Sequence, residues 1–161
     1  MKYRFSGQET FPCRYTWLSK VVEHVAKKPD LFIDKDDAIV RLGVGKNMVQ
    51  AIGFWAEVTG VAEIRGKKTV SRELDITTLG NKVLGAKGHD KYLEDVRTLW
   101  LIHWKLCSNF EHPIFTWHFM LNFWHRNDFT ISEARAFLLE ESARLEGKPS
   151  KATIENQLHT F

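Results

Sequence analysis

The sequence has few of the features that mark secreted, membrane-spanning or disulfide-stabilised proteins. It holds two cysteines among 161 residues, Cys13 and Cys107, and a chain of this size can bury a sufficient core without covalent cross-links. Its longest apolar stretch, around residues 99–104, contains His103 and ends at Lys105. No apolar run follows the first charged residues, as one does in a signal peptide. We therefore expect a cytoplasmic protein with free thiols and no membrane contact.

A strong charge of one sign is also absent. The formal net charge is +3, which by itself neither requires nor excludes a polyanionic partner. The charges are unevenly placed, however: residues 1–89 hold 15 Lys and Arg against 10 Asp and Glu, whereas residues 90–161 hold 8 against 10. We therefore look for a nucleic-acid contact in the first half of the chain.

Signatures of catalysis and of metal or nucleotide binding are lacking as well. Residues 43–47 resemble a phosphate-binding loop, but Val40 stands in place of its first glycine and Asn47 in place of its hydroxyl residue. His103 and Cys107 lie four residues apart, yet no CxxC or HExxH pair supports a zinc site. Acidic residues that are adjacent in sequence point in different directions on a helix, so they do not form a catalytic carboxylate pair. No serine lies in the elbow motif of a catalytic nucleophile. We expect no enzymatic activity, no metal and no cofactor.

Residues 34–60 carry the pattern of a helix-turn-helix. Asp34 can cap a first helix, the glycines at residues 43–45 break it, and Lys46 or Asn47 opens a second helix. Apolar residues of this second helix recur at helical spacing: Met48, Ala51, Ile52, Trp55 and Val58. Lys46, Asn47 and Gln50 lie elsewhere on it, where a recognition helix offers side chains to base edges and phosphates. The alternative for Asn47 is that it caps the helix.

The next segment changes from a helical to a strand-like pattern. Apolar and β-branched residues on both sides of residues 66–68 predict a β-hairpin. This hairpin is basic and has no acidic residue between positions 64 and 72; its candidate phosphate contacts are Arg65, Lys67, Lys68 and Arg72. Thr77 or Thr78 can cap a short helix that ends at Gly85. With a first helix over residues 16–28, this order of elements predicts a winged-helix domain spanning residues 1–88.

Residues 1–16 show neither a helical nor an alternating period, so we expect an irregular arm. Its aromatic residues would pack on the first domain: Phe5, Phe11 and Tyr15. The alternative is an arm that touches DNA through its cations: Lys2, Arg4 and Arg14.

The second half, residues 89–161, is predicted to be an aromatic-rich helical domain. Apolar residues spaced along residues 93–107 and 115–124 predict two helices packed against each other, with Trp100 and Trp104 on the buried stripe. Stacking of nucleic-acid bases on these aromatics is the weaker alternative. Thr130 and Glu133 form a capping-box pattern for a third helix, and Ser150 can cap a last one.

Three blocks of the sequence resemble one protein family. They are FSGQETFPCRYTWLSK at residues 5–20, AIVRLGVGKNMVQAIGFW at residues 38–55 and YLEDVRTLWLIHWKLCSN at residues 92–109. Together they resemble the bacterial DUF4007 family of unknown function. The resemblance implies an association with DNA phosphorothioation and anti-phage restriction systems, without defining a chemistry. Gln8 departs from the family pattern, which has His at this position, and typical members are longer than this chain.

We therefore predict a mainly α protein: an N-terminal winged helix-turn-helix with a small β-hairpin wing, followed by a helical domain. The predicted function is non-enzymatic binding of double-stranded DNA, with the helical domain contacting a protein partner or a second copy of the chain. Two alternatives stay open. The winged helix can bind protein as an interaction scaffold, or the chain can be an accessory subunit of a DNA-modifying enzyme.

Overall fold

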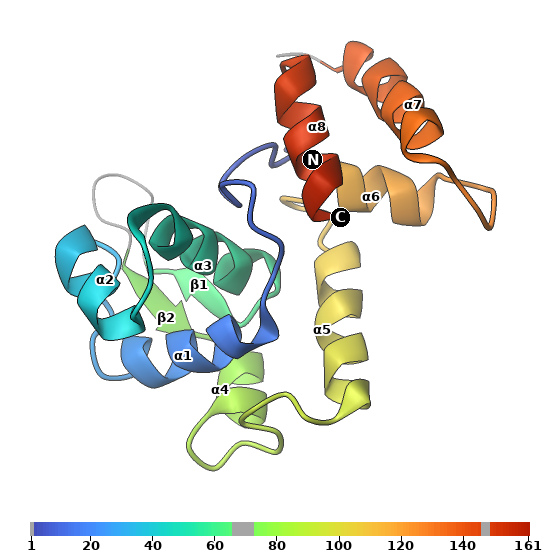
Figure 1. Ribbon diagram of the computed structural model, residues 1–161. Coiled ribbons are helices and arrows are strands. Elements are labelled where there is room, and N and C mark those ends of the chain that lie inside the picture. The colour runs from blue at the N-terminus through green and yellow to red at the C-terminus, as the bar shows by residue number, and fades with distance from the viewer. Residues whose placement is uncertain (1, 66–72, 146–148) are drawn as a thin grey trace.

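The computed structural model describes residues 2–65, 73–145 and 149–161, and within these ranges the chain is mainly helical with one small antiparallel sheet (Figure 1). The elements of the first half are α1 (Tyr15–Val25), α2 (Lys35–Leu42), α3 (Lys46–Val58), β1 (Ala62–Ile64), β2 (Leu74–Ile76) and α4 (Thr78–Leu84). Those of the second half are α5 (Val96–Cys107), α6 (Phe115–Asn122), α7 (Ile131–Ala143) and α8 (Lys151–Thr160). The prediction of a mainly α protein is confirmed.

Short polar side chains begin the helices where the sequence predicts them. The Asp34 carboxylate accepts hydrogen bonds from two backbone N–H groups in the first turn of α2. The hydroxyls of Thr77 and Ser150 do the same for α4 and α8. Thr130 and Glu133 form the predicted capping box of α7. Because each cap satisfies N–H groups that the helix itself leaves unpaired, these residues fix where the helices start.

The helix α3 is the most deeply buried element of the first half. Of the predicted stripe, Ala51, Ile52, Trp55 and Val58 are buried and Met48 is half-buried. Phe54, which lies beside this stripe on the helix, is also only 1% exposed. The N-terminal arm covers Phe54. Gly7 lies so close to the Phe54 ring that an added Cβ would meet it at 2.4 Å. The exposed residues of α3 are therefore those near its start: Lys46, Asn47 and Gln50.

Two hydrophobic cores hold the chain together. The first is built mainly from α1 to α4 and the small sheet, with contributions from α5 and from Trp117 of α6. In the sheet Ala62 pairs with Ile76 and Ile64 with Leu74. The second is built from α6, α7 and α8 around Phe115 and Leu138. In Figure 1, α7 and α8 lie side by side above α6, away from the sheet.

The N-terminal arm joins the two halves. Lys2 and Arg4 donate backbone hydrogen bonds to the carbonyl groups of Glu111 and Pro113. The Arg4 carbonyl in turn accepts hydrogen bonds from the Phe115 backbone N–H and from Gln157 Nε2 on α8. The arm thus extends from α8 to the start of α1 (Figure 1).

The arm packs differently from the sequence-based expectation. Phe11 contacts the first core as predicted, but Phe5 packs against the second core, with its ring centroid 5.1 Å from that of Phe115. Tyr15 is 53% exposed at the start of α1. The prediction that Phe5 and Tyr15 pack on the first domain was wrong. The arm contacts both cores, and the spacing of residues in an irregular segment does not show which core each of them contacts.

The helix α5 exposes aromatic residues that the sequence analysis placed in the core. Ile102 and Leu106 are buried against the first core, whereas Trp100 is 66% exposed and Trp104 is 60% exposed. In Figure 1 α5 lies beside the first half and meets α6 only at its end. These neighbours cover only part of the apolar stripe of α5, so the rest of the stripe is exposed. Because α5 contributes to the first core, apolar packing continues past residue 88. The division into domains 1–88 and 89–161 stays a prediction.

Candidate nucleic-acid interface

The exposed first turn of α3 holds three of the predicted DNA-binding residues. Gly45 occupies the N-cap position and has no side chain to cap the helix, so Lys46 and Asn47 are the first two helical residues. Asn47 therefore does not cap α3, which removes that alternative. The side chains of Lys46, Asn47 and Gln50 are all exposed. The free N–H groups and the helix dipole make this end of α3 favourable for negative charge.

An acidic residue of the arm already contacts this turn. Gln50 Nε2 donates a hydrogen bond of 2.7 Å to the carboxylate of Glu9. Glu9 has a positive φ of 50° in a tight turn, in which the Phe11 N–H donates to the Gln8 carbonyl. No sequence pattern predicts this contact, because Glu9 and Gln50 lie in segments that only the fold brings together.

At the base of the hairpin, the charge of Arg65 is compensated. Its guanidinium bonds the carboxylate of Asp75 on β2, with Nε 2.8 Å from Oδ2, and lies 3.7 Å from Glu73. The Arg65 hydrogen bond lowers the pKa of Asp75 below its usual value, so the carboxyl stays ionised. The other predicted contacts of the hairpin lie outside the described residues: Lys67, Lys68 and Arg72.

Two of the three cations of the arm, Arg4 and Arg14, make contacts within the protein. Arg4 Nη1 lies 3.0 Å from Glu57 Oε2 near the end of α3, and its guanidinium also stacks on the Phe54 ring at 4.9 Å. The Arg14 guanidinium lies over the Trp17 ring at 5.2 Å. These contacts favour the structural arm over the DNA-touching arm.

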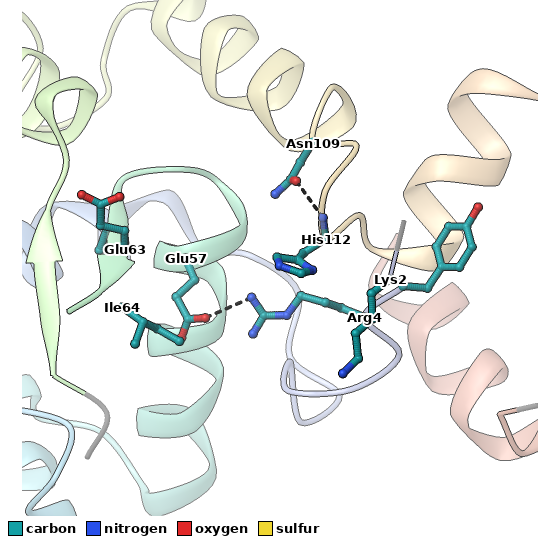
Figure 2. Close-up of a pocket in the computed structure, with 9 residues that line it drawn as sticks. Lys2, Arg4, Glu57, Glu63, Ile64, Asn109 and His112 are labelled. Atoms are coloured by element: carbon teal, nitrogen blue, oxygen red, sulfur yellow. Dashed lines mark hydrogen bonds and ion pairs between the residues drawn. The ribbon is translucent and has the colours of Figure 1, made fainter. Parts of the chain in front are cut away.

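The Arg4–Glu57 ion pair lines a cavity of about 300 Å³ between the two halves (Figure 2). Lys2 and Arg4 enter it from the arm and Glu63 from β1, while His112 comes from the segment between α5 and α6. The Asn109 side chain accepts a hydrogen bond from the His112 backbone, which orders that segment. Opposite charges balance here, so the cavity has no strong preference for an ion of either sign.

A second cavity of about 280 Å³ lies beside the first turn of α3. Its lining comes from the arm at residues 5–10, from Asn47 and from two residues of α8, Thr153 and Asn156. Gln8 lines it as well and is only 3% exposed, and its side-chain oxygen has no hydrogen-bond partner among the described residues. This cavity reaches the start of the predicted recognition helix at Asn47.

The pair His103 and Cys107, which the sequence analysis weighed as part of a zinc site and set aside, does form a contact. His103 Nε2 lies 3.6 Å from Cys107 Sγ. Burial raises the pKa of the Cys107 thiol to about 11, so this sulfur is protonated at neutral pH. Within residues 2–65, 73–145 and 149–161, no group of three His, Cys, Asp or Glu side chains is arranged to hold a metal ion. No helix in these ranges is long and apolar enough to cross a membrane.

Comparisons with known proteins identify relatives by sequence and by structure. The sequence profile described as "Protein of unknown function (DUF4007)" matches residues 5–161. No curated protein matches the sequence. An SspB crystal structure superimposes with a TM-score of 0.86 at 29% identity, and a magnesium ion-bound SspB crystal structure does so with a TM-score of 0.87 at 27% identity. Each match covers 99% of this chain.

The similar structures are considerably longer than this chain. It covers 48% of the magnesium-bound SspB chain and 49% of the other, and thus spans about half of their length. Magnesium binding is a property of that SspB crystal structure and is not carried over to this chain. We therefore assign no metal-dependent step to this chain.

Proposed function

This chain belongs to the DUF4007 family, whose profile matches residues 5–161, and we propose that it is a non-enzymatic protein that binds double-stranded DNA. In this proposal α2 and α3 form a helix-turn-helix, and β1 and β2 form the base of a wing. The single observation that carries it is the exposed first turn of α3, which presents Lys46, Asn47 and Gln50 after an uncapped helix start.

The arrangement of this turn suits a recognition helix. The rest of α3 is buried between the first core and the arm, so the helix is held rigidly while its beginning projects outward. Asn and Gln side chains can bond the N6 and N7 edge of adenine in the major groove, and Lys46 can contact phosphate. Gly43 allows the sharp turn before α3, because its φ of 65° lies in the left-handed region that glycine adopts without strain.

Selection of binding sites from a pool of random duplexes tests the proposal. We expect the protein to enrich a motif, and we expect Gln50→Ala to relax that motif while its affinity for unselected duplex is unchanged. Asn122→Ala, on α6, is the matched control and leaves the motif intact. Failure of the parent protein to bind any duplex at low salt contradicts the proposal.

A second candidate function is protein binding through α5. Trp100 and Trp104 are more than half exposed, and exposed aromatic side chains are enriched at protein interfaces. This contact is compatible with DNA binding at α3, and it is also the surface that an interaction scaffold or accessory subunit would use. Sedimentation of the parent and of a variant with both Trp100→Ala and Trp104→Ala tests this contact. Self-association of the parent that the variant loses supports a homodimer through α5. A parent that stays monomeric excludes a homodimer through this surface.

The link to DNA modification is part of the same proposal. The family resemblance implies a role beside phosphorothioation or anti-phage restriction, and two free cysteines suit the cytoplasm in which such systems act. Parallel binding isotherms on phosphorothioated and unmodified duplexes of one sequence test this link. Equal affinities for the two duplexes would leave DNA binding standing and remove recognition of the modification.

A further inference from the structure

The cavity of about 280 Å³ beside α3 has the chemistry of a small-molecule site. Apart from Phe5 and Gly7, the side chains that line it are hydroxyls, amides and one carboxylate: Ser6, Gln8, Glu9, Thr10, Asn47, Thr153 and Asn156. No lysine, arginine or histidine is found among these residues, so an anionic ligand such as phosphate has no countercharge there. A neutral ligand rich in hydrogen-bonding groups fits the lining best.

The amide oxygen of Gln8, which has no partner among the described residues, indicates that this cavity is incomplete without a ligand. Gln8 is only 3% exposed, and its Oε1 atom has no hydrogen-bond partner in the described part of the chain. A buried polar atom without a partner costs free energy, and such atoms are uncommon in folded proteins. Because Oε1 is itself inaccessible as placed, it reaches a ligand in the cavity when the amide rotates about its last torsion, which exchanges the positions of its oxygen and its NH₂ group.

The wall that carries Gln8 is held in place by its neighbours. Gly7 fits against Phe54 with no space for a side chain. The backbone carbonyl of Phe11 accepts a 2.9 Å hydrogen bond from Trp55 Nε1. Between these anchors Glu9 adopts a positive φ of 50°, a conformation that non-glycine residues rarely keep unless the surroundings enforce it. The cavity therefore exists before a ligand arrives.

We propose that this cavity binds a nucleobase that carries an exocyclic amino group. Gln8 Oε1 and the Glu9 carboxylate are acceptors, and the amino groups of adenine and cytosine are the donors that Gln, Asn, Glu and Asp side chains recognise. The base can come from a nucleotide extruded from the duplex at α3, in which case the inference rests on the proposed DNA binding. It can also come from a free nucleoside, which has the same recognition chemistry.

Two variants separate ligand binding from stability. Gln8→Met removes the acceptor at similar volume, and we expect the variant to melt no lower than the parent because Oε1 makes no hydrogen bond to the described residues. Asn156→Ala alters the opposite wall at an exposed position. Asn127→Ala, exposed on the segment between α6 and α7, is the matched control.

The first measurement is an NMR titration of the full chain with deoxyadenosine, deoxycytidine and thymidine. We expect the two amino-bearing nucleosides to shift the backbone signals of residues 6–10 in a saturable way and thymidine to bind more weakly. Gln8→Met is expected to weaken that binding about tenfold, as the loss of one hydrogen bond to a buried group implies. Absence of saturable shifts, equal binding of thymidine, or unchanged affinity of Gln8→Met overturns the inference.

The second measurement identifies the source of the base. A duplex that contains 2-aminopurine becomes more fluorescent when this base leaves the stack, and we expect such a rise with the parent and Asn127→Ala but not with Gln8→Met. Nucleoside binding without that rise assigns the cavity to free nucleosides. If nucleosides bind but no duplex does, this inference stands and the proposed function is rejected. If duplex binds but neither the NMR shifts nor the fluorescence rise is seen, the proposed function stands and this inference is rejected.

Discussion

The side chains of Gln50 and Glu9, 41 residues apart in sequence, are joined by a hydrogen bond of 2.7 Å. Gln50 is one of the three exposed side chains at the start of α3, so an acidic residue of the arm occupies one position that a DNA base would contact. Under the proposed function this hydrogen bond has to break when Gln50 reads a base. Glu9 then lies near the phosphates and opposes binding by like charge.

Neutralising Glu9 is therefore expected to strengthen DNA binding. Glu9→Gln removes one negative charge beside α3 while keeping the size of the side chain, and we expect duplex affinity to rise roughly two- to fivefold at low salt. Fluorescence anisotropy with a labelled duplex measures this change. Glu94→Gln, on the segment before α5, is the control, and an equal gain in both variants would assign the effect to net charge alone.

Two tryptophans with opposite exposure provide a test of the packing. Trp55 is fully buried between Phe54 and Trp117, and its Nε1 donates a hydrogen bond to the Phe11 carbonyl. We expect Trp55→Ala to lower the free energy of unfolding by about 3–5 kcal/mol. Trp100→Ala, at a position 66% exposed, is expected to cost less than ~1 kcal/mol. Urea unfolding measures both, and similar costs for the two variants contradict the assignment of α5.

The close contact between Gly7 and Phe54 predicts a sharp difference between two glycines. Gly7 has a φ of 123°, and an added Cβ would lie 2.4 Å from the Phe54 ring. We expect Gly7→Ala to destabilise the protein by roughly 1–3 kcal/mol. At Gly45 nothing lies within 4 Å of an added Cβ, so Gly45→Ala is the control with a much smaller effect. Thermal unfolding of both variants tests whether the arm is held as described.

The capping box of α7 predicts a dependence of stability on acid. Hydrogen bonds from Arg126 and from Thr130 lower the pKa of Glu133 from 4.5 to about 2. The ionised carboxylate therefore stabilises the fold above pH 4.5, and this contribution is lost as the pH falls from 4.5 toward 2. Melting temperatures of the parent and of Glu133→Gln should converge across that range.

Arg126→Gln provides the matched test, because it removes the guanidinium that makes the largest contribution to this pKa shift. It should reduce the acid-dependent loss in the same pH range. A difference between the parent and Glu133→Gln that persists unchanged at pH 2 shows that the carboxylate is not the group responsible.

Local patterns in the sequence were sufficient to predict where the helices and the two strands occur. Asp34, Thr77 and Thr130 cap helices where the sequence predicts caps, because capping depends on residues within one turn. The hairpin was likewise predictable from its β-branched residues, and β1 and β2 pair as expected. The family resemblance is confirmed over residues 5–161.

Contacts between distant segments were not predictable in this way. The spacing of Trp100 and Trp104 indicates an apolar helix face, but only the placement of α5 shows that this face lacks a covering element in the described structure. The contact of Glu9 with Gln50 and the unpartnered Gln8 amide arise where the arm meets α3 and α8. No periodic pattern encodes where an irregular arm lies, so this part of the candidate site became visible only in the fold.

In the proposed function, the start of α3 and the basic hairpin bind the DNA backbone, and this binding can be tested by measuring how duplex affinity depends on salt. A plot of log K against log salt has a slope that falls in magnitude by about one unit for each phosphate contact removed. We predict a reduction of about one unit for Lys46→Ala and about two for the Lys67→Ala, Lys68→Ala variant, with no change for Lys105→Ala on α5. A parent protein that binds no duplex, or slopes that are identical in all four proteins, contradicts the account.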